Sequence, residues 1–369
     1  MLLGALPFVV PGGVPWTVDA VRSVVGPAPI AWLEDRVYGA RDALMQKARA
    51  DEAPKELWTA PAEPLSSPDA APPPEAAAIA TRAFPPPRFQ PISSKFASTH
   101  DGVWLNVADD VAPDAPPVMA KASVHPDTTR PYAVVAVLAM YLPELELNLV
   151  AGTREPESDV VGKDKRPGKV PAEHAASLVA AFNGGWQAMH GHFGMMLDGD
   201  VFLPPRDRGC TVAMYKDGLV RLGTWTKISP LPGEMRAYRQ GPRCLVEAGA
   251  SAGGLKDEAL GWGASVDGET VIRRSALGLS EDGQTLFFGM GDDLTARTVA
   301  DALARAGAKT VMELDINASF PRFLMYAHDG DGVHVKEALM PAKFSPGEYV
   351  AKPWYRDFFY VRRRPPTPH

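Results

Sequence analysis

Residues 294–315, LTARTVADALARAGAKTVMELD, carry the clearest structural signal in this chain. The first half has apolar residues at helical spacing and ends at Gly307, a typical helix stop. The apolar positions are Val299, Ala300, Leu303 and Ala306. The second half, residues 310–314, is an apolar run of strand length. With a strand before the helix, this order predicts a right-handed crossover between two parallel strands.

Asp315 comes directly after this apolar run, and Asn317 and Ser319 follow it. Ligands of α/β proteins commonly bind at sheet edges, beyond the ends of strands. A buried strand would also hold the Asp315 carboxylate in a fixed position, as catalysis requires. Asp, Asn and Ser are common turn residues too, so an ordinary turn is the alternative. Asp315 is therefore our candidate catalytic carboxylate.

The composition indicates an ordinary globular protein. Of its 369 residues, 46% are hydrophobic and 22% are charged, which is enough to bury the core of one or two domains. The net charge is −6 and no basic cluster is present, which argues against nucleic acid as a partner. The sequence has no Walker A, G-x-S-x-G or H-E-x-x-H motif, and we expect no cofactor.

The chain divides into three parts by composition. Residues 1–52 combine an apolar N-terminus with helical periodicity, and residues 53–94 form a Pro/Ala-rich linker. Residues 95–369 form the main domain. The first ten residues are too short to span a bilayer but match the apolar core of a signal peptide or the tail of a membrane anchor. We therefore expect an exported protein, in the periplasm, cell envelope or extracellular space, with a possible membrane tether.

The main domain is predicted to be mixed α+β, with one central mixed β-sheet and flanking helices. Residues 132–140 and 145–150 are expected to form paired strands. Residues 211–215 and 219–222 flank one turn, and residues 276–279 and 285–288 flank another, so each pair predicts a hairpin. Residues 171–181 have helical spacing and predict a helix that ends at Asn183-Gly184-Gly185.

Several further residues are candidates for ligand binding. The amides of Gly184 and Gly185 could donate to anionic oxygens, although two glycines also make a plain helix cap. His190 and His192 would share one face of a strand and could bind a metal, but a polar loop or a substrate contact is the favoured interpretation, and no metal site is predicted. Arg274 follows another arginine and could bind a phosphate or carboxylate; otherwise it marks an exposed strand end.

Cys210 and Cys244 are the only cysteines and lack metal-ligand spacing. They could form one disulfide or be two separate core thiols. The second interpretation is slightly favoured, because a chain of this size needs no disulfide to fold.

These motifs, in this order, resemble those of the phosphodiester glycosidase family. The matching elements are Asn183-Gly184-Gly185, Asp198-Gly199, Arg274-Ser275-Ala276-Leu277-Gly278, residues 299–308, and Leu314-Asp315. Many members of that family continue with Gly-Gly-Gly-Ser after the aspartate, where this chain has Ile316-Asn317-Ala318-Ser319. In this respect the chain resembles a bacterial branch of the family, whose members have the sequence Met-Glu-Leu-Asp-Ile-Asn at this position. The bulkier residues narrow the backbone access to a ligand.

The resemblance implies a hydrolase that cleaves the sugar C1–O bond of a sugar-1-phosphodiester or another phosphate-containing glycan. In that interpretation Asp315 and Arg274 are catalytic, with Arg274 holding the phosphate together with the amides of Gly184 and Gly185. Asn183, Asn317 and Ser319 would bind sugar hydroxyls, and His190 or His192 could supply a proton. One alternative is a non-catalytic module that binds an envelope glycan or teichoic-type polymer on a Pro-rich stalk. Another is a metal-dependent hydrolase that uses His190 and His192.

Overall fold

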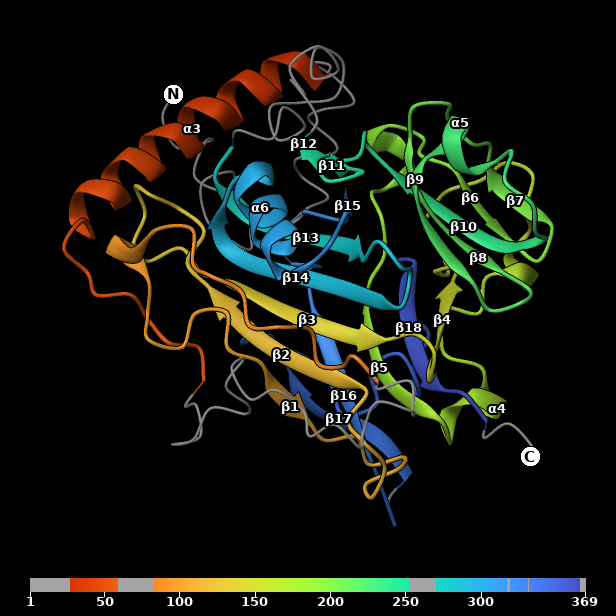
Figure 1. Cartoon of the computed structure of the whole chain (residues 1–369). Helices are drawn as coiled ribbons and strands as arrows, with labels where there is room; N and C mark the ends of the chain where they lie inside the picture. The colour runs from red at the N-terminus through yellow and green to blue at the C-terminus, as the bar shows by residue number, and fades with distance from the viewer. Residues whose placement is uncertain (1–26, 59–81, 252–269, 317–318, 331, 366–369) are drawn as a thin grey trace.

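A computed structural model describes residues 27–58, 82–251, 270–316, 319–330 and 332–365. Its largest sheet has eight strands in the order β1-β2-β3-β14-β13-β15-β11-β12 (Figure 1). Their bounds are β1 Leu105–Val107, β2 Met119–Val124, β3 Val135–Tyr141, β11 Val246–Glu247, β12 Ala250–Ser251, β13 Ile272–Leu279, β14 Thr285–Leu294 and β15 Thr310–Glu313.

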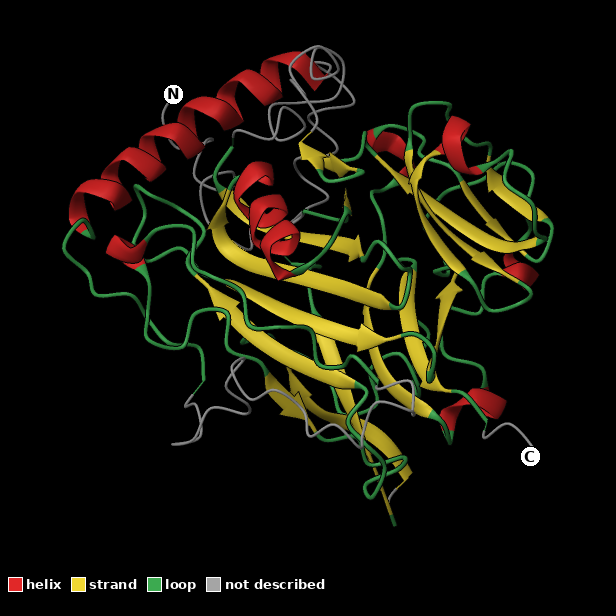
Figure 2. Ribbon diagram, viewed as in Figure 1, coloured by secondary structure: helices red, strands yellow, loops and turns green. Residues whose placement is uncertain are grey.

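Two five-stranded sheets complete the body (Figure 2). One has the order β17-β16-β5-β18-β4, with β4 Leu145–Val150, β5 Leu178–Asn183, β16 Phe323–Asp329, β17 Gly332–Ala338 and β18 Phe358–Arg363. The other has the order β7-β6-β10-β8-β9, with β6 Met195–Leu197, β7 Asp200–Leu203, β8 Cys210–Tyr215, β9 Val220–Thr224 and β10 Met235–Gly241. The described helices are α3 Pro27–Ala48, α4 Ala172–Ala175, α5 Trp225–Ile228 and α6 Ala296–Ala306, with 3-10 turns η2 Ser94–Phe96, η3 Lys163–Lys165 and η4 Ala188–His190.

The α+β class is confirmed, and a strand, a helix and a strand, β14, α6 and β15, follow one another as predicted. Helix α6 begins with a capping box between Thr295 and Thr298 and ends at Gly307, whose φ of 117° favours glycine. Strands β14 and β15 both pair antiparallel with β13, so they run parallel to each other with β13 between them. All pairings among the described strands are antiparallel, so the parallel pairing expected of a mixed sheet is not formed there.

The main core lies between the eight-stranded sheet and the sheet that contains β5. Phe182 of β5 packs on Phe288 of β14 with ring centroids 5.2 Å apart, and on Phe323 and Phe359 of its own sheet at 5.4 and 5.3 Å. Complete burial of each ring stabilises the fold by about 1.5–3 kcal/mol. Helix α6 covers the opposite face of the large sheet (Figure 1). Val299 of this helix packs there in the same cluster as Val137.

The helix predicted over residues 171–181 is wrong. Only Ala172–Ala175 is helical, and Leu178–Asn183 forms strand β5 in the centre of its sheet. All six residues of β5 are buried, so the strand shows a continuous apolar run instead of alternation. Such a run cannot be distinguished from a buried helix by periodicity. Asn183-Gly184-Gly185 therefore follows a strand, not a helix.

The expected pairing of residues 132–140 with 145–150 is also wrong, because β3 and β4 lie in different sheets. Both predicted hairpins are confirmed as β8–β9 and β13–β14. Cys210 and Cys244 form a disulfide, which corrects the interpretation as separate thiols.

Part of the Pro-rich segment packs on the body. Phe89 is buried against Trp104, with ring centroids 5.6 Å apart, and Trp104 Nε1 donates to the carbonyl of Pro87 at 3.1 Å. Residues 59–81 of the predicted linker and residues 1–26, including the predicted export signal, lie outside the described residues. Within the described part, no helix has both the length and the apolar character needed to cross a membrane.

Candidate functional site

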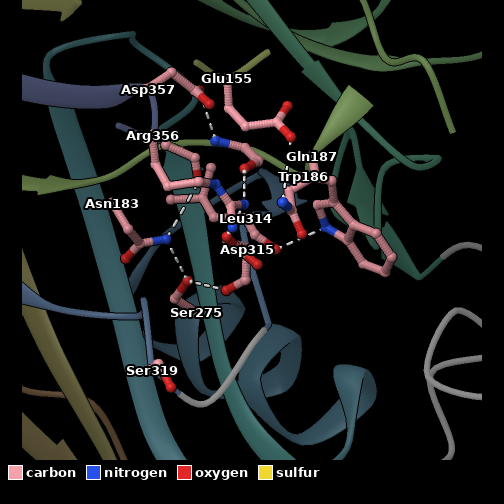
Figure 3. A network of polar contacts seen from close by, with 12 residues as sticks. Glu155, Asn183, Trp186, Gln187, Ser275, Leu314, Asp315, Ser319, Arg356 and Asp357 are labelled. Atoms are coloured by element: carbon pink, nitrogen blue, oxygen red, sulfur yellow. Dashed lines mark hydrogen bonds and ion pairs between the residues drawn. The ribbon is translucent and has the colours of Figure 1, made fainter. Parts of the chain in front are cut away.

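Asp315 lies immediately beyond β15, as the sequence predicts, and its backbone is fixed on both sides. Its amide donates to the carbonyl of Gly184 at 3.2 Å, and its carbonyl accepts from Ser275 Oγ at 2.9 Å. The preceding carbonyl, that of Leu314, accepts from Trp186 Nε1 at 2.8 Å (Figure 3). Asp315 is 6% exposed, and two segments of the chain, residues 184–186 and Ser275, fix its backbone in this buried position.

The Asp315 carboxylate forms a buried ion pair with Arg356, which precedes β18. Arg356 Nη2 also reaches the Gly185 carbonyl at 3.4 Å, and the Phe320 ring lies 4.3 Å from the guanidinium carbon. The Nε and Nη1 atoms of Arg356 are buried and have no hydrogen-bond partner within the described residues. Each such donor costs about 1–3 kcal/mol when left unsatisfied. Buried donors without a partner call for an explanation, and a bound anion is one of the groups that could satisfy them.

Asn183, the last residue of β5, is linked by hydrogen bonds to the segment that contains Asp315. Its Nδ2 donates to Ser275 Oγ at 2.9 Å, and its Oδ1 accepts from the amide of Arg322 at 3.1 Å. Ser275 in turn donates to the Asp315 carbonyl. The structure therefore brings Asn183 and Asp315 together through Ser275, with the Asn183 amide group bonded to protein atoms.

Gly184 and Gly185 also meet this site, but their amides already have protein partners. Gly184 N donates to the Asp357 carbonyl at 3.1 Å, and Gly185 N donates to Asp357 Oδ2 at 3.0 Å. Asp357 forms a fully buried ion pair with Arg239, whose Nε lies 2.9 Å from Oδ2. A Cβ at Gly185 would lie 2.7 Å from Arg239 Cζ. The glycines therefore allow close packing on the Asp357–Arg239 pair, and this corrects the expectation that their amides are available to a phosphate.

Arg274 lies on the other face of the large sheet. Its neighbours in β13 alternate, with Leu277 in the core shared with β5 and Ala276 in the core beneath α6. The Arg274 side chain is fully buried and forms an ion pair with Glu313, and it donates to the carbonyls of Leu294 at 3.1 Å and Thr270 at 2.8 Å. Arg274 thus lies at the sheet face away from Ser275 and is not the arginine that contacts Asp315.

The Glu313 carboxyl links the two ion pairs electrostatically. Complete burial raises its pKa, the Arg274 guanidinium opposes that rise, and the charge of Asp315 adds to it. Arg274 therefore has its own buried partner in Glu313 and does not contact Asp315.

His190 and His192 do not have the strand geometry that a shared metal would need. His190 ends the 3-10 turn η4, and His192 has a φ of 47° and an exposed side chain. Within the described residues there is no cluster of three or more His, Cys, Asp or Glu side chains that could hold a metal. Ser319 is exposed and its carbonyl accepts from Arg322 Nη2 at 2.7 Å, while Asn317 lies outside the described residues.

Arg356 and Asp357 are the residues that the sequence reasoning missed. They precede the apolar run of β18, so they carry the same kind of signal, polar residues at a strand end, that identified Asp315. Glu155 was also missed. Its carboxylate accepts from Gln187 Nε2 at 3.2 Å and from the Ala188 amide at 3.0 Å, which fixes the segment after Trp186 (Figure 3).

Comparisons with known proteins find likeness only at the level of structure. No protein-family model matches the sequence, and no curated protein matches it. A structure of the zebrafish N-acetylglucosamine-1-phosphodiester alpha-N-acetylglucosaminidase catalytic domain, auto-inhibited by its pro-peptide, aligns with 71% of this chain and 88% of that chain at 13% identity and a TM-score of 0.42.

Two further structures align less well. A hypothetical protein from Synechocystis aligns over 68% of this chain and 64% of that chain, at 11% identity and a TM-score of 0.40. A protein from Burkholderia pseudomallei K96243, inferred to be exported, aligns over 62% and 74%, at 12% identity and a TM-score of 0.29. Since all three TM-scores lie below 0.5, we base no functional argument on these alignments.

Proposed function

We propose that this chain is a glycosidase-type hydrolase that cleaves the sugar C1–O bond of a sugar-1-phosphodiester. The observation that carries the proposal is the Arg356–Asp315 pair, in which a buried guanidinium has two nitrogens without a hydrogen-bond partner among the described residues, beside a buried carboxylate. This pair offers the two groups that the reaction needs, a cation for the phosphate and a carboxylate for the sugar carbon. The motif resemblance described above supports the same reaction.

Arg356 takes the phosphate-binding role that the sequence reasoning gave to Arg274. Its Nε and Nη1 can donate to phosphoryl oxygens while Nη2 stays on Asp315. Bonds from a charged donor contribute about 1.5–3 kcal/mol each, and more of that gain falls on the transition state as negative charge develops on the leaving phosphate. Phe320 holds the guanidinium plane from one side. Arg274 is instead paired with Glu313 on the other face of the large sheet.

Asp315 acts on the sugar carbon as nucleophile, as general base towards water, or by stabilising the positive charge that develops at C1. In each case the C1–O bond breaks and its electron pair leaves with the phosphate oxygen. Water supplies the new hydroxyl at C1 and a proton to the products. Because a phosphate ester is already a good leaving group, the reaction needs little general-acid assistance. Ser319 is retained as a candidate contact to sugar hydroxyls, whereas the amide group of Asn183 is bonded to protein atoms and positions Ser275.

Hydrolysis in water labelled with ¹⁸O tests the proposed bond cleavage. Nucleotide sugars and alkyl esters of sugar 1-phosphates are incubated with the protein, and both products are analysed by mass spectrometry. Cleavage of C1–O places the label in the sugar, whereas cleavage of P–O places it in the phosphate. Label in the phosphate would replace the proposal with that of a phosphodiesterase.

A binding module without catalytic activity is the second candidate. Ile316 is 8% exposed and packs with Trp186 and Phe193. A bulky apolar side chain therefore occupies the position at which many members of the resembled family have glycine. Binding of phosphate-containing glycans without turnover would favour this candidate. Activity that is lost on chelation and restored by metal would instead favour the hypothesis of a metal hydrolase using His190 and His192.

We also propose that the protein is exported. Disulfides persist mainly in oxidising compartments, so the Cys210–Cys244 disulfide supports an exported location. The proposed N-terminal membrane tether is a separate expectation, since it falls on residues 1–26.

A further inference from the structure

An aromatic cluster lies beside the Arg356–Asp315 pair and reaches the surface at Tyr355. The Phe320 ring packs on the Arg356 guanidinium at 4.3 Å, and the Tyr355 ring meets Phe320 edge-on with ring centroids 5.6 Å apart. The Trp354 ring lies 5.2 Å from that of Tyr355. Phe320 is only 8% exposed, whereas Tyr355 is 41% exposed. The cluster thus leads from the buried ion pair to an accessible aromatic ring.

The backbone around Tyr355 is firmly held. Its carbonyl accepts from the amides of Arg154 at 3.1 Å and Glu155 at 2.9 Å, and the carbonyl of Trp354 accepts from the Thr153 amide at 2.9 Å. The neighbouring rings limit the side chain further. An exposed single aromatic residue is common on protein surfaces, but one held this rigidly next to a candidate catalytic pair is a preorganised contact surface.

Electrostatics also places Tyr355 near the pair. Burial raises the pKa of its hydroxyl, the guanidinium groups of Arg356 and Arg322 oppose that rise, and the Asp315 charge adds to it. All three charges therefore act on the Tyr355 side chain.

We propose that the exposed ring of Tyr355 is the stacking surface for the sugar ring of the substrate. This inference rests on the proposed function, because it assumes that the phosphate binds Arg356 and the sugar carbon faces Asp315. One face of a pyranose ring presents C–H groups of slight positive charge, and these pack well on the negative face of an aromatic ring. A tyrosine offers this surface at a low cost in side-chain entropy. Tyr355 would then recognise the sugar, and Arg356 the phosphate.

Calorimetric titration with two kinds of probe separates these roles. Inorganic phosphate reports on Arg356 alone, and a panel of glucose, galactose and N-acetylglucosamine 1-phosphates reports on phosphate and sugar together. We expect wild type to bind at least one sugar phosphate about tenfold more tightly than phosphate, and Tyr355→Ala to lose most of this difference while its affinity for phosphate stays within about twofold. Tyr355→Phe keeps the ring and should behave like wild type. Tyr355→Leu, which keeps apolar bulk but no ring, should resemble Tyr355→Ala.

Three results would overturn the stacking role: no preference of wild type for any sugar phosphate, an unchanged preference in Tyr355→Ala and Tyr355→Leu, or an equal loss for phosphate and sugar phosphate. The last result would mean that Tyr355 merely holds Phe320 and Arg356 in place. Turnover is not part of this readout. Wild type could prefer a sugar phosphate yet hydrolyse no diester, while the Tyr355→Ala variant loses that preference. In that case the proposed reaction fails and the stacking role of Tyr355 stands.

Discussion

Arg356 and Asp315 form a buried ion pair in which the arginine still has two nitrogens, Nε and Nη1, without a partner in the described part of the chain. Asp315 follows β15 and Arg356 precedes β18, so strands of two different sheets bring the pair together. An ion pair that served only the fold would gain from satisfying all its donors. The unused donors therefore point to a bound anion as their partner.

Arg356→Lys should weaken the binding of inorganic phosphate at least about tenfold, because lysine keeps the charge but not the planar set of donors. Arg274→Lys is the matched control. It alters an equally buried arginine whose guanidinium bonds Glu313 and two carbonyls, so it should lower stability and leave phosphate affinity within about twofold. Calorimetric titration measures affinity, and thermal unfolding measures stability. A larger loss of phosphate binding in Arg274→Lys would return the anion-binding role to Arg274.

Gly185→Ala should destabilise the fold by several kcal/mol, since its Cβ would come within 2.7 Å of the Arg239 guanidinium carbon, which is fully buried and held by Asp357. Gly330→Ala serves as the control, because nothing lies within 4 Å of the added Cβ there. Urea unfolding of both variants measures the difference. Equal stability of the two would show that the Asp357–Arg239 pair can move aside.

The Cys210–Cys244 disulfide should contribute roughly 3–4 kcal/mol to the free energy of unfolding, because it closes a loop with a sequence separation of 34 residues in the unfolded chain. The double variant Cys210→Ala, Cys244→Ala should show this loss in urea unfolding, and a reductant should affect wild type but not the variant. If wild type unfolds at the same urea concentration with and without reductant, the disulfide does not stabilise the protein as expected.

Asp127 should make stability depend on pH in the acid range. Burial alone would raise its pKa, but hydrogen bonds from Thr129 and Arg130 outweigh burial, so the pKa lies below its ordinary value of 3.8. A depressed folded pKa means that this stabilisation is present above the unfolded pKa and is lost as pH falls through the folded pKa. The stability difference between wild type and Asp127→Asn should therefore shrink below about pH 4. A constant difference between wild type and Asp127→Asn down to about pH 2 would contradict the assignment.

The parts of this fold that could be predicted from sequence are those with local signals. Helix α6 carries its own apolar stripe and Gly307 cap, and β15 and the hairpin β13–β14 lie close to it in the chain. Asp315 was found because it ends an apolar run. Strand β5 was mistaken for a helix because it is buried on both faces and has no alternation.

The rest of the site depends on contacts between distant segments. Arg356 meets Asp315 across 41 residues of sequence, and no local pattern distinguishes it from Arg274. Arg274 stood out because it follows another arginine at a strand start, yet alternation along β13 places its side chain on the face opposite Ser275. The amides of Gly184 and Gly185 looked available only because Asp357, which occupies them, is far away in sequence.

The central claim is that Asp315 acts in the hydrolysis of sugar-1-phosphodiesters. The kcat/KM of Asp315→Asn on the best substrate among the nucleotide sugars and alkyl esters of sugar 1-phosphates tests it most directly. This substitution keeps the shape of the side chain and removes its charge. We predict that wild type releases free sugar and that Asp315→Asn loses at least about 10²–10³-fold in kcat/KM, while Asp159→Asn keeps the wild-type value. Release of sugar by Asp315→Asn within a few-fold of the wild-type rate, with the variant folded, would contradict the account.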